Sequence, residues 1–399
     1  MSVVRRLVRS SLARVVAHVP IAGERAARVV RGDSSPPPSP ESAVMLREEE
    51  ATPANDASYE APAPRKEPLD PGWPPPSFDK IIGEKRFQAQ HIVTYDWDYG
   101  TKRQELRVLY EKSKDLNWNA RTDLPWNISV DPESELTPDM FNPIFGTDIW
   151  KKLDPKREVP KLRRHIASYL FSNFLHGEQG ALLATAQLVE AAPTTDAKLY
   201  AAAQVFDEAR HVEAYNRYLT EKVELVYPPN PHLKQLLDTV LSDSRWDMKL
   251  LGMQILIEGL ALGAFGLIHQ TANEPLIKKL TQMIMQDEAR HVAFGVMSLK
   301  GLYAEMSEAD LREREDFVLE SCRLLRDRFL GQEVWETVGL PVRECEEAAK
   351  DSMMMQMFRK LLFSKIVPNI KRLGLLTPRV RRGFEELQVI EYESWAPSA

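Results

Sequence analysis

The hexapeptide DEARHV occupies residues 207–212 and returns without change at residues 287–292. Each copy contains a glutamate three residues before a histidine, a spacing that places both side chains on one face of a helix. A further glutamate lies 30 residues before each of these glutamates, at Glu178 and Glu258. The chain therefore carries four carboxylates and two imidazoles as two equal sets, and we interpret the rest of the sequence as their scaffold.

The equal spacing predicts how the two sets meet. The midpoint between the two glutamates of a set is Pro193 in the first half and Asn273 in the second, 15 residues from each glutamate. If the chain reverses there, each half is a helical hairpin whose glutamates both lie about 22 Å from the turn. Two such hairpins packed together form a four-helix bundle with all six side chains at one level. The alternative is a chance match between two salt-bridged surface helices.

This pattern resembles the ferritin-like di-iron carboxylate oxidases, over about residues 157–305. That superfamily includes bacterial multicomponent monooxygenases, soluble acyl-carrier-protein desaturases, the small subunit of ribonucleotide reductase and arylamine N-oxygenases. The resemblance implies two bound iron ions, or manganese with iron, and dioxygen as a co-substrate. It implies six metal ligands: Glu178, Glu208, His211, Glu258, Glu288 and His291. It also implies a separate reductase or ferredoxin as electron donor, and the sequence has no Cys-x-x-Cys for an iron–sulfur module of its own.

The neighbours of these six residues repeat as well. Asp207 and Asp287 each precede a glutamate, and Arg210 and Arg290 each precede a histidine. We expect the aspartates to accept the free N–H of a ligand histidine and so fix its tautomer, with the arginines paired to them. The sequence does not say which histidine each aspartate serves. Ordinary surface ion pairs are the alternative.

Tyr215 is a candidate redox residue. It lies four residues after His211 on the same helix face, a spacing similar to that of the radical tyrosine in ribonucleotide reductase small subunits. The matching position in the second half is Gly295, so the tyrosine is not part of the repeat. Core packing is the alternative explanation.

One position counts against a subgroup of the superfamily. Arylamine N-oxygenases carry an extra histidine ligand four residues before the last of the glutamates. Here that position is Ile284, which counts against an arylamine N-oxygenase.

Composition sets further bounds. The chain is 43% apolar, enough for a substantial core, and its net charge of -6 gives no sign of nucleic-acid binding. Cys322 and Cys345 have no metal-like spacing, so a reducing, cytoplasmic location is the simplest expectation. The oligomeric state is open, with a homodimer as one alternative.

The N-terminal part differs from the rest. Residues 1–32 are an arginine-rich arm, which is interpreted as disordered, as an amphipathic helix on an anionic membrane, or as a cleaved targeting peptide. Residues 33–78 are rich in proline and are typical of a disordered linker. The folded domain is expected to span residues 79–399, with its bundle core at about 157–306.

The helical pattern is that of an all-α chain, without strand-like alternation of any length. The long bundle helices are expected at about residues 159–192, 194–223, 244–271 and 275–306. Additional helices are expected at 99–114, 233–241 and 308–332, from Thr137-Pro138, and from about 344. Trp118 and Trp126 lie in an aromatic-rich loop and are expected to anchor it against the bundle.

Two stretches have a membrane alternative. From Leu250 to Ile268 the only charged residue is Glu258, so this helix could span a bilayer by length, but a buried core helix is favoured because its glutamate falls at a ligand position. The basic C-terminal region, about 344–384, has eight basic residues and no acid between Ser352 and Glu385. It is interpreted as a solvated face, with docking to an acidic partner or a membrane as the alternatives.

The predicted function is a non-haem di-iron oxidase or oxygenase that activates dioxygen. It would oxidise a small-molecule or acyl substrate by hydroxylation, desaturation or N-oxygenation. The alternatives are a ferroxidase or iron-handling protein, a radical-generating subunit that uses Tyr215, and a di-manganese catalase.

Overall fold

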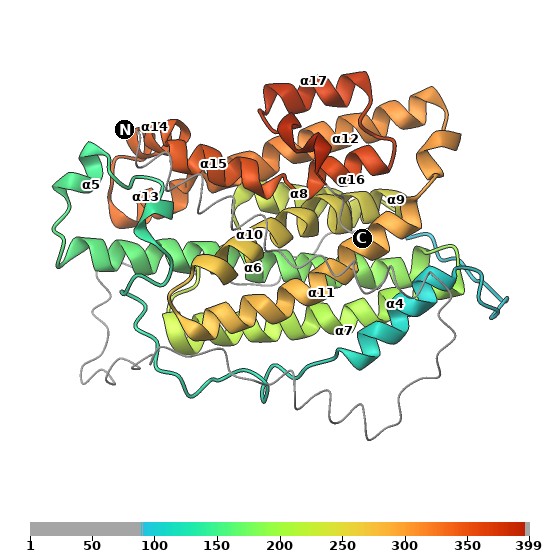
Figure 1. Cartoon of the computed structure of the whole chain (residues 1–399), viewed down its shortest axis with the longest axis horizontal. Helices are drawn as coiled ribbons and strands as arrows, with labels where there is room; N and C mark the ends of the chain where they lie inside the picture. The colour runs from blue at the N-terminus through green and yellow to red at the C-terminus, as the bar shows by residue number, and fades with distance from the viewer. Residues whose placement is uncertain (1–88, 90, 396–399) are drawn as a thin grey trace.

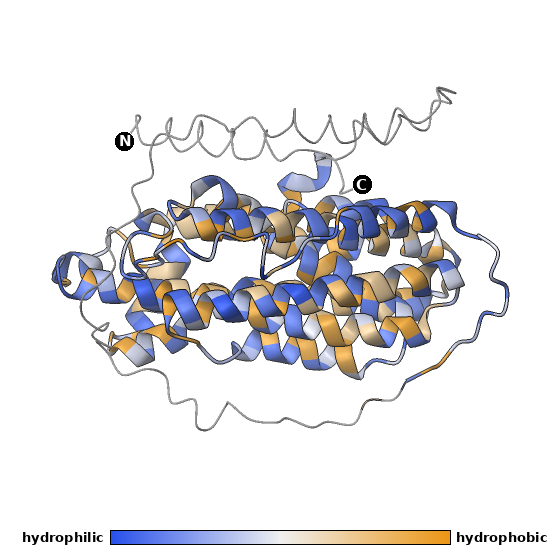
Figure 2. Ribbon diagram, turned by 90° about the horizontal axis from the view of Figure 1, so that it is seen from below, coloured by the Kyte–Doolittle hydropathy of each residue, from blue (hydrophilic) through white to orange (hydrophobic). Residues whose placement is uncertain are grey.

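The computed structural model of the chain describes residue 89 and residues 91–395. The predicted basic arm and proline-rich linker lie outside the described residues. Within the described part every regular element is a helix, so the all-α prediction is confirmed. Figure 2 shows hydrophilic and hydrophobic residues interspersed along the helices, and the buried hydrophobic residues of the long helices belong to one core.

The first helical hairpin consists of α6 (Glu158–Ala191) and α7 (Thr195–Tyr218), which lie side by side (Figure 1). The chain reverses near Pro193, as the spacing predicts, and Thr194 caps α7 by accepting a hydrogen bond from the backbone N–H of Ala197. A π-helical turn, η3 (Leu219–Val223), follows α7. The predicted end near Val223 is therefore correct only if this wider turn is counted with the helix.

The second hairpin has a composite first arm, made of α9 (Trp246–Leu250), a π-helical segment η4 (Leu251–Ile257) and α10 (Glu258–Thr271). Its second arm is α11 (Pro275–Leu299), which Glu274 caps through the backbone N–H groups of Leu276 and Ile277. The predicted extension of this arm to residue 306 is wrong. Gly301 takes a left-handed conformation with a φ of 82°, which ends the helix and starts the 3-10 turn η5 (Leu302–Glu305).

The apolar arm of the second hairpin is a core helix in this fold. Over Trp246–Thr271 it is long enough and apolar enough to cross a membrane, with a mean hydropathy of 1.8 in its most apolar window. However, 89% of that window is buried inside the protein. Burial by neighbouring helices accounts for the apolar composition, as the buried interpretation expected.

The remaining helices flank the two hairpins. On one side α4 (Gln104–Asp115) crosses α7 and α11, and it begins at residue 104 instead of 99. On the other side, above α8 (Pro231–Ser242), η4 and α10, lies a C-terminal layer (Figure 1). That layer comprises α12 (Glu308–Asp327), η6 (Arg328–Leu330), α13 (Gln332–Val338), α14 (Val342–Asp351), α15 (Met353–Leu362), α16 (Ile366–Arg372), α17 (Pro378–Glu386) and η7 (Ile390–Ser394). Thr137-Pro138 starts only a 3-10 turn, η2 (Asp139–Phe141), and the short helix α5 (Asp148–Lys152) follows it.

The basic side chains of the C-terminal layer make contacts within the chain. Arg379 pairs with Glu315 at 3.6 Å, and Arg381 pairs with Glu393. Lys371 lies 3.6 Å from the same Glu393. These pairs connect elements within the layer, and the three basic side chains are between 32% and 52% exposed, so the interpretation as a solvated face stays a prediction.

Candidate metal centre

All six candidate ligands converge between the two hairpins. Their potential donor atoms form two groups, in each of which the atoms lie within 4.8 Å of one another. One group contains Glu178, Glu208, His211 and Glu288, and the other contains Glu208, Glu258 and His291. Every one of these side chains is buried, with an exposed fraction of 6% or less. The interpretation as two matching surface helices is therefore wrong.

Two glutamates lie between the two halves of the cluster. Glu208 presents Oε2 to the Nδ1 atom of His211 at 3.5 Å and Oε1 to the Nδ1 atom of His291 at 3.1 Å. Oε1 of Glu288 lies 3.3 Å and 3.6 Å from the same two nitrogens. Of the two histidines, Glu178 approaches only His211, with 3.2 Å between its Oε2 atom and Nδ1. Glu208 belongs to both groups of donors, and Glu288 approaches both histidines, so these two carboxylates lie between the two groups.

The electrostatics of the cluster favour bound cations. Burial and the adjacent Glu288 carboxylate raise the pKa of Glu178 to about 8, and burial with the carboxylates of Glu288 and Glu208 raises the pKa of Glu258 well above its usual range. Burial alone would lower the pKa of His211, but the carboxylates around it raise that pKa well above its ordinary value. Without metal ions, the glutamates with raised pKa values therefore keep a proton that an ordinary carboxylate would lose near neutral pH. His211 likewise keeps a second proton and its positive charge.

Several buried donor atoms of the cluster lack a hydrogen bond. They are Oε2 of Glu208, Oε2 of Glu258, both carboxylate oxygens of Glu288 and Nδ1 of His291. Buried polar atoms of this kind are costly unless something satisfies them. Oxygen and imidazole nitrogen are donors that suit iron and manganese, so the residues present fit a pair of such ions.

The repeated aspartates are arranged crosswise. Asp287 of the second repeat lies 3.0 Å from Nε2 of His211 in the first repeat, and Asp207 lies 3.2 Å from Nε2 of His291. Each aspartate thus accepts from the other repeat's imidazole, which leaves Nδ1 facing the carboxylates. The His211 imidazole also lowers the pKa of Asp287 against the opposing effect of burial, so this carboxylate stays ionised.

Two arginines pair with these aspartates. Arg210 donates to Asp207 at 2.5 Å and to Asp287 at 2.9 Å. Arg290 donates to Asp287 at 2.5 Å and lies 3.4 Å from Asp207. Both arginines and both aspartates are at least 90% buried, so the alternative of surface ion pairs is wrong.

Two residues join the cluster without having been predicted as site residues. The indole N–H of Trp118 donates to Oδ2 of Asp287 at 2.7 Å, so this tryptophan is more than the packing anchor that was expected. The side-chain amide of Gln204 donates to Glu208 at 2.9 Å and to Glu258 at 3.0 Å. Gln204 lies one turn before Glu208 on a buried helix face, and that position could have identified it; no sequence signal marks Trp118.

Tyr215 is fully buried, and its hydroxyl has no hydrogen-bond partner among the described residues. Its ring packs against Phe174 and Phe265, with centroid distances of 5.8 Å and 6.2 Å. This environment is compatible with core packing and with a redox role. Ile284 is also fully buried, one turn before Glu288 on α11, and it contributes no donor atom to the cluster.

Comparison with known proteins gives one family and a set of distant structures. Residues 100–374 match the sequence profile of the p-aminobenzoate N-oxygenase AurF family. Among solved structures, dimanganese(II)-NrdF of Streptococcus sanguinis is 15% identical, with 73% of this chain and 98% of that chain covered and a TM-score of 0.45. An R2-like ligand-binding oxidase with a Mn/Fe cofactor is 17% identical, with 67% and 93% covered and a TM-score of 0.36. No curated protein matches the chain.

Proposed function

We propose, because the chain belongs to the p-aminobenzoate N-oxygenase AurF family, that it is a non-haem di-iron oxygenase that uses dioxygen to oxidise an organic substrate. The observation that carries the proposal is the set of six buried donors with unsatisfied atoms between the two hairpins. We assign the metal ligands to these residues: Glu178, Glu208, His211, Glu258, Glu288 and His291. Iron at both positions, or manganese with iron, fits this donor set.

When bound, the metal pair supplies electrons to dioxygen at one place and next to the substrate. The chain's own residues prepare that place. Glu208 and Glu288, each of which approaches both histidines, would help to hold both ions. Asp207 and Asp287 hold each imidazole with Nδ1 toward the ions and keep its proton on Nε2. Burial of all these groups excludes bulk water from the reacting centre.

The family assignment overturns one expectation from the sequence. Ile284 counted against an arylamine N-oxygenase, yet the matching family is that of an N-oxygenase. The departure at this position remains, since a buried isoleucine stands where arylamine N-oxygenases have a seventh ligand. The proposal therefore keeps hydroxylation and desaturation beside N-oxygenation as reactions of this centre.

Electrons for the reaction are proposed to come from a separate reductase or ferredoxin, because the chain has no Cys-x-x-Cys. A cytoplasmic location, with the basic N-terminal arm as a membrane contact, also remains a proposal. So does a homodimeric assembly.

A radical-generating function is the second candidate, and it rests on the position of Tyr215 beside the candidate metal ligands. The phenol is buried among aromatic rings one turn from His211, without a hydrogen-bond partner in the described part of the chain. A persistent tyrosyl signal in electron paramagnetic resonance after exposure of the reduced protein to oxygen would support this function. The signal must disappear in Tyr215→Phe.

The main proposal is tested by metal analysis joined to a comparison of metabolites. The wild-type protein is expected to bind about two metal ions per chain, and Glu208→Ala is expected to bind few, because Glu208 belongs to both groups of donors. Glu213→Ala is the matched control, since it removes an exposed acid from the same helix. Cells that express the wild type or the control should contain an oxidised product that Glu208→Ala cells lack. Full metal loading of Glu208→Ala would refute the assignment of the centre.

A further inference from the structure

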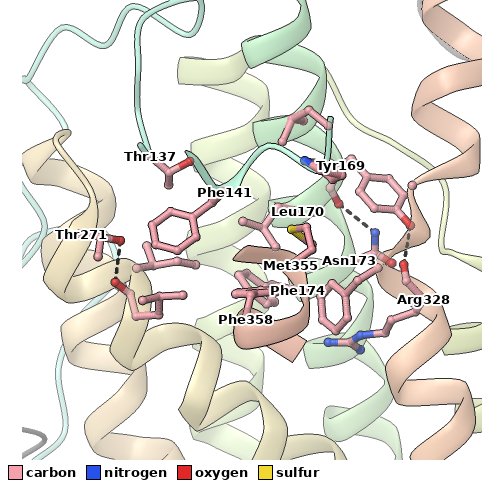
Figure 3. Close-up of a pocket in the computed structure, with 16 residues that line it drawn as sticks. Thr137, Phe141, Tyr169, Leu170, Asn173, Phe174, Thr271, Arg328, Met355 and Phe358 are labelled. Atoms are coloured by element: carbon pink, nitrogen blue, oxygen red, sulfur yellow. Dashed lines mark hydrogen bonds between the residues drawn. The ribbon is translucent and has the colours of Figure 1, made fainter. Parts of the chain in front are cut away.

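The candidate metal centre has a different environment at each of its two ends along the bundle. At one end, Phe174 lies one turn before Glu178 on α6 and lines an apolar pocket between α6, α10, η6 and α15 (Figure 3). Its ring packs against those of Tyr215 and Phe265, with centroid distances of 5.8 Å and 4.9 Å. The Tyr215 hydroxyl has no hydrogen-bond partner among the described residues, so these three rings give the ligand carboxylates no hydrogen bond.

The opposite end carries a buried amide. Gln204 lies one turn before Glu208 on α7, which runs antiparallel to α6, and its side chain is fully buried. Its Nε2 group donates to Oε1 of Glu208 at 2.9 Å and to Oε1 of Glu258 at 3.0 Å. A reversed amide would place its carbonyl oxygen against two carboxylates, so these acceptors fix the orientation of the group. One neutral side chain thus joins carboxylates from both hairpins.

The carboxylate of Glu258 has little else to orient it. In the described part of the chain, Gln204 is the only side chain that hydrogen-bonds to it, and its Oε2 atom has no partner. By contrast, Glu178 lies 3.2 Å from Nδ1 of His211, and Glu208 lies within 3.5 Å of both histidines. Loss of the Gln204 amide would therefore free Glu258, whereas Glu208 would keep its imidazole neighbours.

The amide serves the smaller of the two groups of donors. One group contains four residues; the other contains three, and we call it the second position: Glu208, Glu258 and His291. With fewer anionic donors, the second position should bind its ion less tightly. The residue that matches Gln204 in the other repeat is Ile284, 80 positions later, and both carboxylate oxygens of Glu288 lack a hydrogen bond. The amide is therefore not part of the repeat.

We propose that Gln204 is a positioning residue that holds Glu258 for the second position and so sets how tightly that ion is bound. Because the amide occupies Oε1 of Glu258, Oε2 is the oxygen offered to the ion. The amide is neutral, so it orients two carboxylates without cancelling the negative charge that attracts the ion. This inference rests on the metal centre of the proposed function, but it needs only two bound ions and not the oxygenase reaction.

The test is a stepwise titration of the metal-free full-length protein with Mn(II), in which electron paramagnetic resonance counts the free ion. The wild type is expected to bind about two ions per chain, the second more weakly, and to show the signal of a magnetically coupled pair when both are bound. Gln204→Met keeps the volume of the side chain but removes its donors. We expect the affinity for the second ion to fall roughly 10- to 100-fold and that for the first ion to change less. The signal of an isolated ion should then persist at concentrations that give the coupled pair in the wild type.

Gln254→Met is the matched control. Gln254 is also fully buried and lies one turn before Glu258, but its amide donates to Oγ1 of Thr185 at 3.4 Å and not to a carboxylate. Removing a buried amide should lower the free energy of unfolding in both variants, whereas only Gln204→Met should lose affinity for the second ion. Gln204→Asn is a second variant in case Gln204→Met does not fold. It keeps a buried amide but is one carbon shorter, so it cannot reach both carboxylates and should also weaken the second ion selectively.

Three results would overturn the inference: equal weakening of both ions in the Gln204 variants, wild-type affinities in those variants, or an equal loss of the second ion in Gln254→Met. A wild type that binds no pair of ions would refute the metal centre itself, and the inference with it. If the pair forms and depends on Gln204 while no oxidised product is found, the oxygenase proposal is wrong and the positioning role stands.

Discussion

Asp287 and His211 belong to different copies of the repeated hexapeptide, and they lie 3.0 Å apart through Oδ2 and Nε2. The reciprocal pair joins Asp207 to His291 at 3.2 Å. Each half of the repeat therefore orients an imidazole of the other half. Neither hairpin has a complete site alone, and the packing of α7 against α11 assembles both halves at once.

Replacing Asp287 by asparagine tests this crosswise support. Asp287→Asn keeps the shape of the side chain but removes the charge that orients the His211 imidazole. We expect metal affinity to fall about 10- to 100-fold, and Asp207→Asn should act similarly through His291. Asp148→Asn, at an exposed side chain of α5, is the control. Unchanged metal competition curves for Asp287→Asn would exclude a supporting role for the aspartate.

The indole of Trp118 leads to a second prediction. Trp118→Phe retains an aromatic ring but leaves Oδ2 of Asp287 without its 2.7 Å donor, which should destabilise the protein by about 1–3 kcal/mol and also weaken metal binding. Trp126→Phe is matched, because that indole donates to the backbone carbonyl of Ala120, away from the cluster. Denaturant unfolding should show a lower free energy of unfolding in both variants. Metal titration should show a lower metal affinity only in Trp118→Phe. Equal metal affinities would reduce Trp118 to the packing anchor that the sequence predicted.

The metal-free protein should lose stability as the pH rises. Burial and Glu288 raise the pKa of Glu178 from its ordinary value of 4.5 to about 8, so between these values the folded state binds more protons than the unfolded state. Linkage then requires the free energy of unfolding to fall from about pH 4.5 to pH 8. The raised pKa of His211 acts in the same direction above its ordinary value of 6.5. Bound metal ions replace those protons, so the loaded protein should lack this decline.

Calorimetry checks this prediction on the metal-free and metal-loaded protein at several pH values. A drop in Tm of roughly 5 °C or more between pH 5 and pH 8 is expected for the metal-free protein only. Glu178→Gln should make the decline of the metal-free Tm with pH less steep, since it removes one of the groups whose pKa is raised in the folded state. A metal-free Tm that rises over this interval would show that the cluster is not protonated as its burial requires.

Much of the site could be predicted from sequence because helix geometry converts spacing directly into position. Glu208 and His211 share a helix face because they are three residues apart. Glu178 and Glu258 each lie 30 residues before the second glutamate of their hairpin, and this equal spacing places all the ligands at the same height in the bundle. The contacts that were missed depend on packing between distant segments. Trp118 reaches Asp287 across 169 positions of sequence, and no local pattern records such a contact. The π-helical segment Leu251–Ile257 was missed for a related reason, since its wider turn depends on the helices around it.

That π-helical segment gives the last prediction. A Cβ atom on Gly295 would lie 2.7 Å from Cβ of Gln254 and 3.1 Å from Cδ1 of Ile255, both in the turn that leads directly into Glu258. Gly295→Ala should therefore shift this turn, destabilise the protein by about 1–3 kcal/mol and lower occupancy of the metal site that Glu258 serves. Gly177→Ala is the control beside another ligand, because nothing lies within 4 Å of a Cβ there. That change should stabilise α6 by about 0.5–1 kcal/mol and leave metal content at the wild-type value. Metal analysis with denaturant unfolding of both variants checks the pair, and normal metal content in Gly295→Ala would show that the π segment does not position Glu258.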